Sequence, residues 1–332
     1  MLFPSHIFYE PAALDYPLGK ALKEKYRNVE WTSIESHNNI PELRALPNSS
    51  FALMKKYLII GVRKTHKYTP NHKISDFLVP YTSSGCGAMC LYCYLVCNYN
   101  KCSYLRLFVN REQMLDKLKA AAMASEKELT FEIGSNSDLI LENTITGNLP
   151  WTIENFSKQE RGYITFPTKF DMVKPLLTLD HRGRVIVRMS VNPQEIIRET
   201  EFGTSPLKNR IKALNLLADA GYRVGILIAP VIMAENWKVL YKDLLDTLET
   251  GLSPRVKKGM SVEVIFMTYS FVHRAINGEA FPNAVKLYDK DKMTGRGRGK
   301  YCYTPELKAD GERFLRSEID ARFGPSKIIY VV

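Results

Sequence analysis

The sequence predicts an α/β fold built on an incomplete (β/α)6 barrel, with extensions at the N-terminus and the C-terminus. Short apolar segments rich in β-branched residues alternate with helical patterns through most of the chain. Apolar strands linked by helical crossovers indicate a parallel sheet that is covered on both faces. The chain has 332 residues, of which 45% are hydrophobic, enough for one large or two moderate domains.

The N-terminal part predicts one helix and one strand. Residues 11–27 have the period of an amphipathic helix, with apolar side chains four apart at Leu14, Leu18, Leu22 and Tyr26. Residues 30–56 contain Pro41 and Pro47 and are expected to be irregular. Residues 57–62 are apolar and predict a buried strand.

The rest of the chain supplies the expected barrel. The predicted strands are residues 77–81, 104–109, 129–133, 163–166, 185–191, 223–229 and 261–267. Helical patterns lie between them at residues 111–124, 170–181, 206–220 and 236–250. The tail adds a helix near 306–322 and a final strand at 327–332. Functional residues are expected in the loops after the carboxyl ends of the strands.

Three regions follow from this pattern. Residues 1–76 are expected to form an N-terminal extension that packs on the barrel. Residues 77–268 are expected to form the partial barrel. Residues 269–332 are expected to form a C-terminal region that contacts the substrate.

The chain is basic, and its cations are grouped. Lys and Arg exceed Asp and Glu by 46 − 35 = 11, which favours polyanionic partners. One basic cluster is residues 63–67; the other, residues 290–301, interleaves cations with glycine and ends on Tyr301. This composition suits a loop that contacts phosphates, although a solvated turn has the same composition.

Three closely spaced cysteines are the strongest chemical signal. Cys86, Cys90 and Cys93 have the spacing Cys-x3-Cys-x2-Cys, which suits three ligands of a [4Fe–4S] cluster. A closed electron-transfer cluster takes four cysteines, so three imply an iron with an open position. Radical S-adenosylmethionine (SAM) enzymes carry this spacing, and in them the open iron binds SAM.

Other readings of the cysteines stay open. Cys97 and Cys102 follow closely, so four thiolates would also suit a closed cluster or a zinc site. No second short pair at zinc-finger spacing is present. A disulfide framework is disfavoured in a chain of this length with six cysteines.

Several stretches together resemble the spore photoproduct lyase family of radical SAM enzymes. They are residues 9–20 (Tyr-Glu-Pro-Ala-Ala-Leu-Asp-Tyr-Pro-Leu-Gly-Lys), 36–38, 61–65, the cysteine loop, 131–132 with 137–138, and 295–301. The resemblance runs nearly end to end. It implies an incomplete radical SAM barrel, a [4Fe–4S] cluster, SAM, and repair of 5-thyminyl-5,6-dihydrothymine in DNA.

The resemblance also implies a chemistry for particular residues. In the family a deoxyadenosyl radical takes a hydrogen from C6 of the lesion, the bond between the thymines breaks, and a cysteine returns a hydrogen. Tyr92 and Tyr94 match two family tyrosines that relay the radical, although packing around a cluster would also explain them.

One position departs from the family pattern. The family's hydrogen-donor cysteine lies in a Phe-Glu-x-x-Cys-x-Ser-Asp context, and this chain has Ser135 there. A hydroxyl O–H bond is far stronger than a thiol S–H bond, so Ser135 is a poor hydrogen donor. Three explanations are open: another thiol (Cys97, Cys102 or Cys302) donates the hydrogen, a tyrosine donates it directly, or the substrate differs. Cys97 is the preferred substitute. The alternative for Cys97 is that it is simply a buried apolar residue.

The family match and the strand-end rule also nominate residues for SAM and DNA. The candidates for SAM are Ser137, Lys169, Ser190, Asn192 and Ala229. A lesion inside a duplex must be flipped out to reach a barrel. The candidates for contacts with the distorted DNA are His273, Arg274, Arg296, Arg298, Lys300 and Tyr301.

The leading hypothesis is therefore a DNA-repair lyase. The second hypothesis keeps the radical chemistry but changes the substrate to another nucleotide lesion or a small molecule, because of Ser135. The third is a non-catalytic iron–sulfur protein that binds nucleic acid. The expected partners are UV-damaged DNA or a dinucleotide lesion and an electron donor of the flavodoxin or ferredoxin type. No signal peptide or membrane span is read, so the cytoplasm of a spore-forming bacterium is the expected location.

Overall fold

The structure, a computed structural model, describes residues 3–98, 104–325 and 327–332. These residues form two compact units. The first unit comprises residues 1–89, 94–166 and 178–185, and the second comprises residues 90–93, 167–177 and 186–332, with the undescribed residues set aside. The expected three-region division of the chain stays a prediction.

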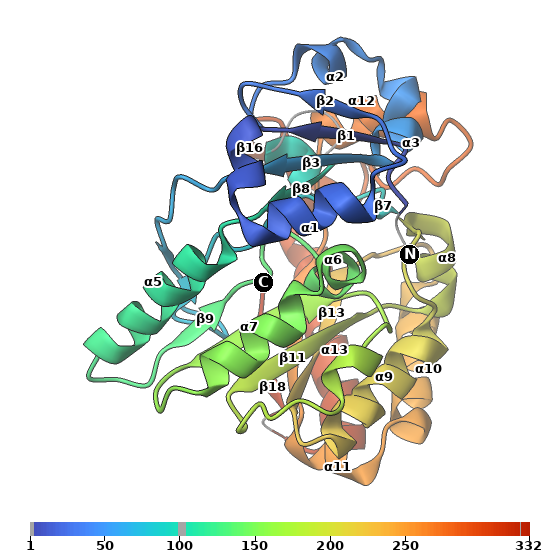
Figure 1. The fold of residues 1–332 in the computed structure, drawn as a ribbon. Coiled ribbons are helices and arrows are strands. Elements are labelled where there is room, and N and C mark those ends of the chain that lie inside the picture. The colour runs from blue at the N-terminus through green and yellow to red at the C-terminus, as the bar shows by residue number, and fades with distance from the viewer. Residues whose placement is uncertain (1–2, 99–103, 326) are drawn as a thin grey trace. The chain divides into compact units, whose positions relative to one another are not determined.

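The first unit contains a five-stranded sheet in the order β2-β1-β3-β8-β6 (Figure 1). Four of its strands are parallel, and β6 runs antiparallel to β8. The strands are β1 (His6–Tyr9), β2 (Trp31–Ser33), β3 (Tyr57–Gly61), β6 (Ser83–Ser84) and β8 (Leu105–Phe108). Register pairs Ser84 with Arg106 at the edge of this sheet.

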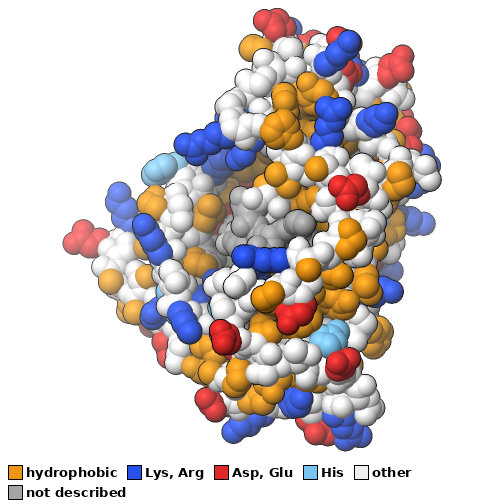
Figure 2. Space-filling view, turned by 90° about the horizontal axis from the view of Figure 1, so that it is seen from above, with side chains coloured by type: hydrophobic (Ala, Val, Ile, Leu, Met, Phe, Trp, Pro, Cys, Tyr) orange, Lys and Arg blue, Asp and Glu red, His pale blue; other side chains and the backbone are white. Residues whose placement is uncertain are grey.

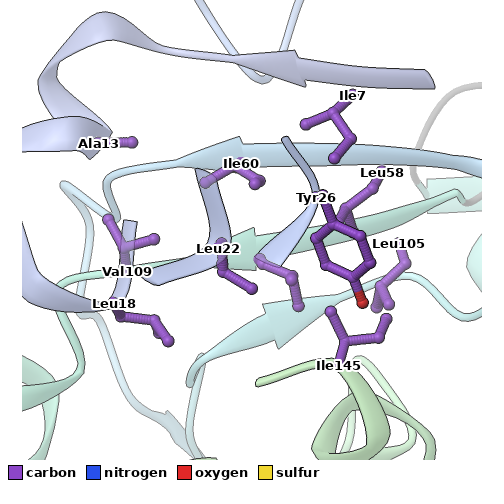
Figure 3. Close-up of a cluster of buried hydrophobic side chains, with 11 residues drawn as sticks. Ile7, Ala13, Leu18, Leu22, Tyr26, Leu58, Ile60, Leu105, Val109 and Ile145 are labelled. Atoms are coloured by element: carbon purple, nitrogen blue, oxygen red, sulfur yellow. The ribbon is translucent and has the colours of Figure 1, made fainter. Parts of the chain in front are cut away.

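Helix α1 (Pro17–Lys25) covers this sheet with an apolar face. Its Leu18 and Leu22 pack with Ile7, Leu58 and Leu105 in one buried cluster (Figure 3). Ile145 joins the cluster from α6 (Leu139–Thr146). Burying apolar surface of this kind stabilises the fold by roughly 25 cal/mol per Å² removed from water.

The first unit also holds the strands β4 (Thr69–Pro70), β5 (Phe77–Leu78) and β9 (Thr130–Glu132), and most of β10 (Tyr163–Thr168), whose last two residues belong to the second unit. Strands β5, β9 and β10 are parallel to one another, and β4 closes the edge antiparallel to β5. Its remaining elements are η1 (Pro11–Asp15), α2 (Pro41–Ala45), η2 (Asn48–Ser50), α3 (Phe51–Met54), α4 (Leu95–Asn98), α5 (Arg111–Ala124) and α7 (Asn148–Ser157).

The second unit is built on four parallel strands in the order β18-β14-β13-β11. They are β11 (Val185–Val191), β13 (Arg223–Val231), β14 (Ser261–Phe266) and β18 (Ile328–Val331). The helices are α8 (Gln194–Thr200), α9 (Leu207–Asp219), α10 (Trp237–Gly251), α11 (Pro254–Gly259), α12 (Phe271–Ala280) and α13 (Pro305–Phe323), with a 3-10 turn η3 (Lys174–Leu176). Of two further short strands, β7 (Met89–Cys90) lies within the cysteine loop and β12 (Glu201–Phe202) directly follows α8.

A separate antiparallel sheet in the second unit contains the second basic cluster. Its strands are β15 (Thr268–Ser270), β16 (Met293–Gly297) and β17 (Lys300–Tyr303), in the order β15-β17-β16. Strands β16 and β17 form a hairpin whose tip is Arg298 and Gly299. Both tip residues have positive φ, 51° and 67°.

Several predicted elements are wrong or incomplete. The strand predicted at residues 104–109 exists as β8, but it belongs to the sheet of β1 and β3 and not to the barrel strands. The helix predicted at 170–181 is absent among the described residues, apart from the single turn η3, because Pro175 removes a backbone donor. The helix predicted at 11–27 divides before Pro17, and residues 30–56 contain short elements.

Two helices escaped prediction. Helices α6 and α7 fill residues 139–157, and they are separated by Gly147 at φ 65°. Asp138 caps α6 by accepting hydrogen bonds from the backbone N–H groups of Ile140 and Leu141. Within the described residues, no helix has both the length and the apolar character needed to cross a membrane.

Candidate active site

Two hydrogen bonds between side chains and the backbone fix the start of the cysteine loop in the first unit. The ammonium of Lys55, a buried residue, donates to the Cys86 carbonyl at 2.8 Å. The backbone N–H of Ala88 points at the Cys86 sulfur, with a distance of 3.4 Å. An N–H directed at a thiolate stabilises its negative charge, which suits a metal ligand.

The end of the loop is anchored in the second unit. Cys93 N–H donates to the Cys90 carbonyl at 3.1 Å and closes a tight turn. The Asn277 side chain donates to the Leu91 carbonyl at 2.8 Å. The loop that carries two of the three cysteines is therefore tied to α12.

His273 belongs to this anchor and not to a DNA-contacting surface. It is buried, and its Nε2 lies 3.0 Å from the Cys93 carbonyl while its Nδ1 lies 3.0 Å from Ser270 Oγ. A carbonyl can only accept, so Nε2 carries the hydrogen and Nδ1 accepts from Ser270. Burial lowers the pKa of His273, although its bond to Cys93 acts against the shift. The predicted phosphate contact of His273 is corrected, because no ring nitrogen faces solvent.

The cluster assignment itself rests on the motif. In the part of the chain that the structure describes, no three Cys, His, Asp or Glu side chains are gathered as a metal site. The cysteines described there, Cys86, Cys90, Cys93, Cys97 and Cys302, are thiols and not disulfides. Cys102 lies outside the described residues.

The structure brings four predicted SAM-binding residues together at the ends of β10, β11 and β13. Lys169 Nζ donates to Ser190 Oγ at 2.7 Å and to the Ala229 carbonyl at 2.9 Å. Ser190 Oγ donates to the same carbonyl at 2.9 Å. Asn192 is fully buried, and its side chain accepts from the Tyr241 hydroxyl at 3.0 Å.

Glu201, which the sequence analysis missed, connects these groups. Its carboxylate accepts hydrogen bonds from Lys169 at 3.0 Å, from Asn192 at 2.9 Å and from Arg210 at 2.6 Å. Burial alone would raise the pKa of Glu201, but the charges of Lys169 and Arg210 outweigh it and hold the pKa at about 2. The signal available in the sequence was weak, because Glu201 is one of three Glu residues between Asn192 and Phe202.

Tyr92 points into the same network. Its phenol donates a hydrogen bond to Glu201 Oε1, and its ring faces Lys169 at 5.4 Å. Burial, together with the neighbouring Glu201 charge, raises the pKa of Tyr92 well above its ordinary value. The phenol therefore keeps its proton at neutral pH.

Tyr94, Ser135 and Ser137 lie in the first unit. The phenol of Tyr94, whose residue surface is 51% exposed, donates to the Ser135 carbonyl. Gly85 of the cysteine loop forms a parallel bridge with Ser137. Ser137 Oγ is buried and has no hydrogen-bond partner within the described residues.

The remaining candidates lie on or near the hairpin. Arg296, Arg298 and Lys300 are exposed on it, and Arg274 is exposed on α12. The Tyr301 ring contacts Phe271 and Tyr288, with centroids 6.1 and 4.8 Å away. Basic side chains therefore extend from a hairpin that aromatic contacts support, which suits contacts with phosphates.

Charge alone does not locate a nucleic-acid surface. On the face shown in Figure 2, Lys and Arg side chains are interspersed with Asp and Glu. The net charge of +11 is therefore not gathered into a single patch on that face.

Comparison with known proteins decides the family. The family model described as Spore photoproduct lyase matches residues 2–332. The chain belongs to the spore photoproduct lyase family. The spore photoproduct lyase of Bacillus subtilis (strain 168) is 33% identical, with 98% of each chain covered. That of Geobacillus sp. (strain Y412MC61) is 30% identical, over 97% of this chain and 96% of the relative.

Solved structures of the family agree over the whole chain. A spore photoproduct lyase complexed with dinucleoside spore photoproduct has a TM-score of 0.92 and 27% identity, covering 100% of this chain and 99% of the other. A double mutant with bound AdoMet and the same dinucleoside has the same score and identity, covering both chains fully. The predicted radical SAM fold, an incomplete barrel, is confirmed.

Membership makes this chain a radical SAM lyase that uses a [4Fe–4S] cluster and SAM. The residues of this chain fit both groups. The Ala88 N–H directed at Cys86 suits a thiolate ligand. The buried hydroxyl of Ser137, without a partner in the described chain, suits a polar group of SAM.

Proposed function

We propose that this enzyme reverses the spore photoproduct in DNA to two thymines, with hydrogen returned by a group other than the side chain at position 135. The observation that supports the proposal most is the end-to-end match to relatives and structures of this family, among them structures that hold the dinucleoside lesion. A base step joined by a covalent lesion is easier to unstack than an intact one, which favours extrusion.

The residues have separate tasks in this proposal. Cys86, Cys90 and Cys93 bind the cluster through thiolates. When bound, SAM and the reduced cluster supply a 5′-deoxyadenosyl radical. Lys169, Ser190 and Asn192 of the second unit and Ser137 of the first are the proposed partners of the polar groups of SAM. Ala229 is proposed to form part of an apolar seat for the adenine.

Glu201 positions the SAM-side residues. It neutralises Lys169 and Arg210 in a buried environment and orients Asn192 and Tyr92 through hydrogen bonds. Pre-organised groups of this kind lose little entropy when a ligand binds.

The remaining question is which group returns the hydrogen to the thymine. Cys97 stays our preferred candidate, and its backbone N–H donates to the Tyr94 carbonyl in the turn that begins α4. Tyr94 is the alternative, because its phenol contacts the backbone of Ser135, at the family's donor position. Tyr92 is less suited, since its phenol is directed at the buried carboxylate of Glu201 and not at position 135.

The test of the overall activity is an anaerobic assay with the reconstituted enzyme, SAM, a reductant and the synthetic dinucleotide lesion. Thymine product and 5′-deoxyadenosine are quantified together by chromatography. Formation of both supports the lyase. Deoxyadenosine without repaired thymine supports the second candidate function, another lesion or a small molecule, which Ser135 favours. Formation of neither product would support the third hypothesis, a non-catalytic protein that binds nucleic acid.

The donor is identified by two variants in the same assay. Cys97→Ala is expected to lower the yield of repaired thymine while deoxyadenosine still forms. If Cys97→Ala is silent and Tyr94→Phe has this effect, the phenol is the donor. Cys302→Ala tests the other described candidate thiol, which lies in the hairpin strand β17, and should leave the yield of repaired thymine unchanged if Cys97 is the donor.

The partners and location complete the proposal. Arg274, Arg296, Arg298, Lys300 and Tyr301 contact the DNA backbone around the lesion. An external donor of the flavodoxin or ferredoxin type reduces the cluster. We expect the enzyme to act in the cytoplasm, where thiols stay reduced.

A further inference from the structure

A basic pocket in the first unit lies outside the residues assigned above. It has a volume of about 160 Å³. At roughly 30 Å³ for each water, this is the space of about five water molecules. Its lining consists of His37, Asn38, Arg63, Lys64, Thr65, Ser84, Arg106 and Phe108.

Two arginines of the pocket are fixed by the fold. Arg106 lies on β8 and is only 3% exposed. Arg63 donates through Nε to the Tyr81 carbonyl at 2.8 Å, and its guanidinium lies 3.8 Å from the centroid of the Phe108 ring. A planar guanidinium held in place is well suited to an anion with two acceptor oxygens.

The carboxylate of Glu10 contacts one lining residue of the pocket, His37, and is engaged by it. Glu10 accepts from the backbone N–H and Nδ1 of His37, at 3.0 and 2.8 Å, and from Val62 N–H at 2.9 Å. Burial alone would raise the pKa of Glu10, but these hydrogen bonds lower it to about 2. Among the described residues that line the pocket, none is Asp or Glu, whereas Arg63, Lys64 and Arg106 are cations, so the lining carries positive charge.

The chemistry of the lining selects among anions. Arg, Lys, Ser, Thr and Asn side chains are the groups that bind phosphate oxygens in protein–DNA complexes. All five types line this pocket, from Asn38, Arg63, Lys64, Thr65, Ser84 and Arg106. Ser84 also lies two residues before Cys86, so the pocket adjoins the cysteine loop along the chain.

We propose that this pocket binds a phosphate group, supplied by the backbone of the lesion-bearing strand. The source of the phosphate rests on the proposed function; the pocket's preference for phosphate does not. A dinucleoside lesion has no phosphate between its sugars, whereas the dinucleotide lesion has one. Comparing the affinities of these two compounds therefore separates the contribution of the pocket to binding from recognition of the thymines.

The experiment measures binding of both lesion compounds to the full-length protein without reductant, and protection from thermal unfolding by inorganic phosphate. The wild type is expected to bind the dinucleotide at least about tenfold more tightly than the dinucleoside, because hydrogen bonds to charged groups contribute that much free energy. Lys64→Ala and Arg106→Gln are expected to reduce this ratio and the protection by phosphate. Lys67→Ala, an exposed lysine outside the pocket, is the control and should change neither.

Each outcome decides the proposal. Lys64 is exposed, so its variant keeps the test valid if Arg106→Gln does not fold. One outcome is that phosphate protects the protein only when Lys64 or Arg106 is present, while the dinucleotide binds no more tightly than the dinucleoside. That outcome supports a phosphate site but overturns the lesion-bearing strand as the source of the phosphate. If phosphate protects in the same way but neither lesion compound binds, the pocket is supported as a phosphate site and the proposed function is overturned. If the wild type and the three variants show the same ratio of affinities and the same protection by phosphate, the proposal that this pocket binds phosphate is overturned.

Discussion

At the scale of single residues, Ser135 is the position where the sequence predicts that the family's hydrogen-donor cysteine is missing. Its carbonyl accepts the Tyr94 hydrogen bond through the backbone, so the side chain is not needed for that contact. Replacing its hydroxyl by a thiol therefore changes the available hydrogen donor while leaving this contact in place.

We expect Ser135→Cys to raise the ratio of repaired thymine to deoxyadenosine, because an S–H bond gives up hydrogen more readily than an O–H bond. The measurement is the product ratio in the anaerobic assay. Ser137→Cys is not a suitable control, since Ser137 is proposed to bind SAM; Ser125→Cys, at the end of α5, is suitable. An unchanged ratio would indicate that the native donor already acts without the side chain at position 135.

Glu201 makes the stability of the second unit sensitive to acid. Its pKa is about 2 in the folded protein, below the ordinary value of 4.5. A lowered pKa gives stability that is fully present above the ordinary value and is lost as the pH falls through the folded value. We therefore expect the free energy of unfolding to decrease between about pH 4.5 and pH 2.

The variant Glu201→Gln should flatten this part of the pH profile. It should also destabilise the protein by about 3–5 kcal/mol at neutral pH, because it leaves buried cations without a carboxylate. Denaturant unfolding across the pH range is the measurement. Glu199→Gln, which removes a surface carboxylate two residues away, should leave the profile close to wild type.

At the scale of elements, the hairpin of β16 and β17 depends on Gly299. A Cβ atom there would lie 2.4 Å from the Phe271 ring, and φ is +67°. Phe271 also contacts Tyr301, so a clash at Gly299 would disturb a predicted DNA contact.

Gly299→Ala is expected to cost about 1–2 kcal/mol from the left-handed backbone alone. It should also weaken DNA binding, because the hairpin's basic side chains would be displaced. Thermal unfolding and lesion-oligonucleotide affinity are the measurements. Gly295→Ala in the same hairpin meets no atom within 4 Å, so it is the control. Similar effects of the two variants would contradict the packing argument.

At the scale of the whole molecule, the excess of 11 positive charges predicts DNA affinity that falls with salt. Each phosphate contact contributes roughly 0.9 to the slope of log K against log salt for duplex DNA. Replacing Arg296, Arg298 and Lys300 together by Ala should therefore reduce the slope by up to ~2.7.

The control for this prediction removes three exposed lysines elsewhere, Lys208, Lys212 and Lys242 on α9 and α10. Titration of a labelled lesion oligonucleotide at several salt concentrations gives the slopes. Equal losses in the two triple variants would show that net charge, and not the hairpin, determines the affinity.

The sequence by itself determined the local chemistry. The cysteine spacing, the family stretches and the parallel strands are readable because each depends on neighbours along the chain, as in the period-two and period-3.6 patterns. The match over the full chain bears out the predicted family, and the parallel sheets bear out the predicted α/β fold. Helix α5 was predicted with its bounds at 111–124.

Only the tertiary structure decided which distant groups meet. Strand β8 pairs with β3 instead of joining the barrel, because its neighbour is set by long-range packing. Glu201 looks like an ordinary surface residue in the sequence, yet folding places it against Lys169 and Arg210 and makes it a buried anion. His273 looked like a phosphate contact, and folding turned its ring inward to hold Cys93. Local patterns determine secondary structure, whereas burial and charge pairing depend on contacts that the local sequence does not encode.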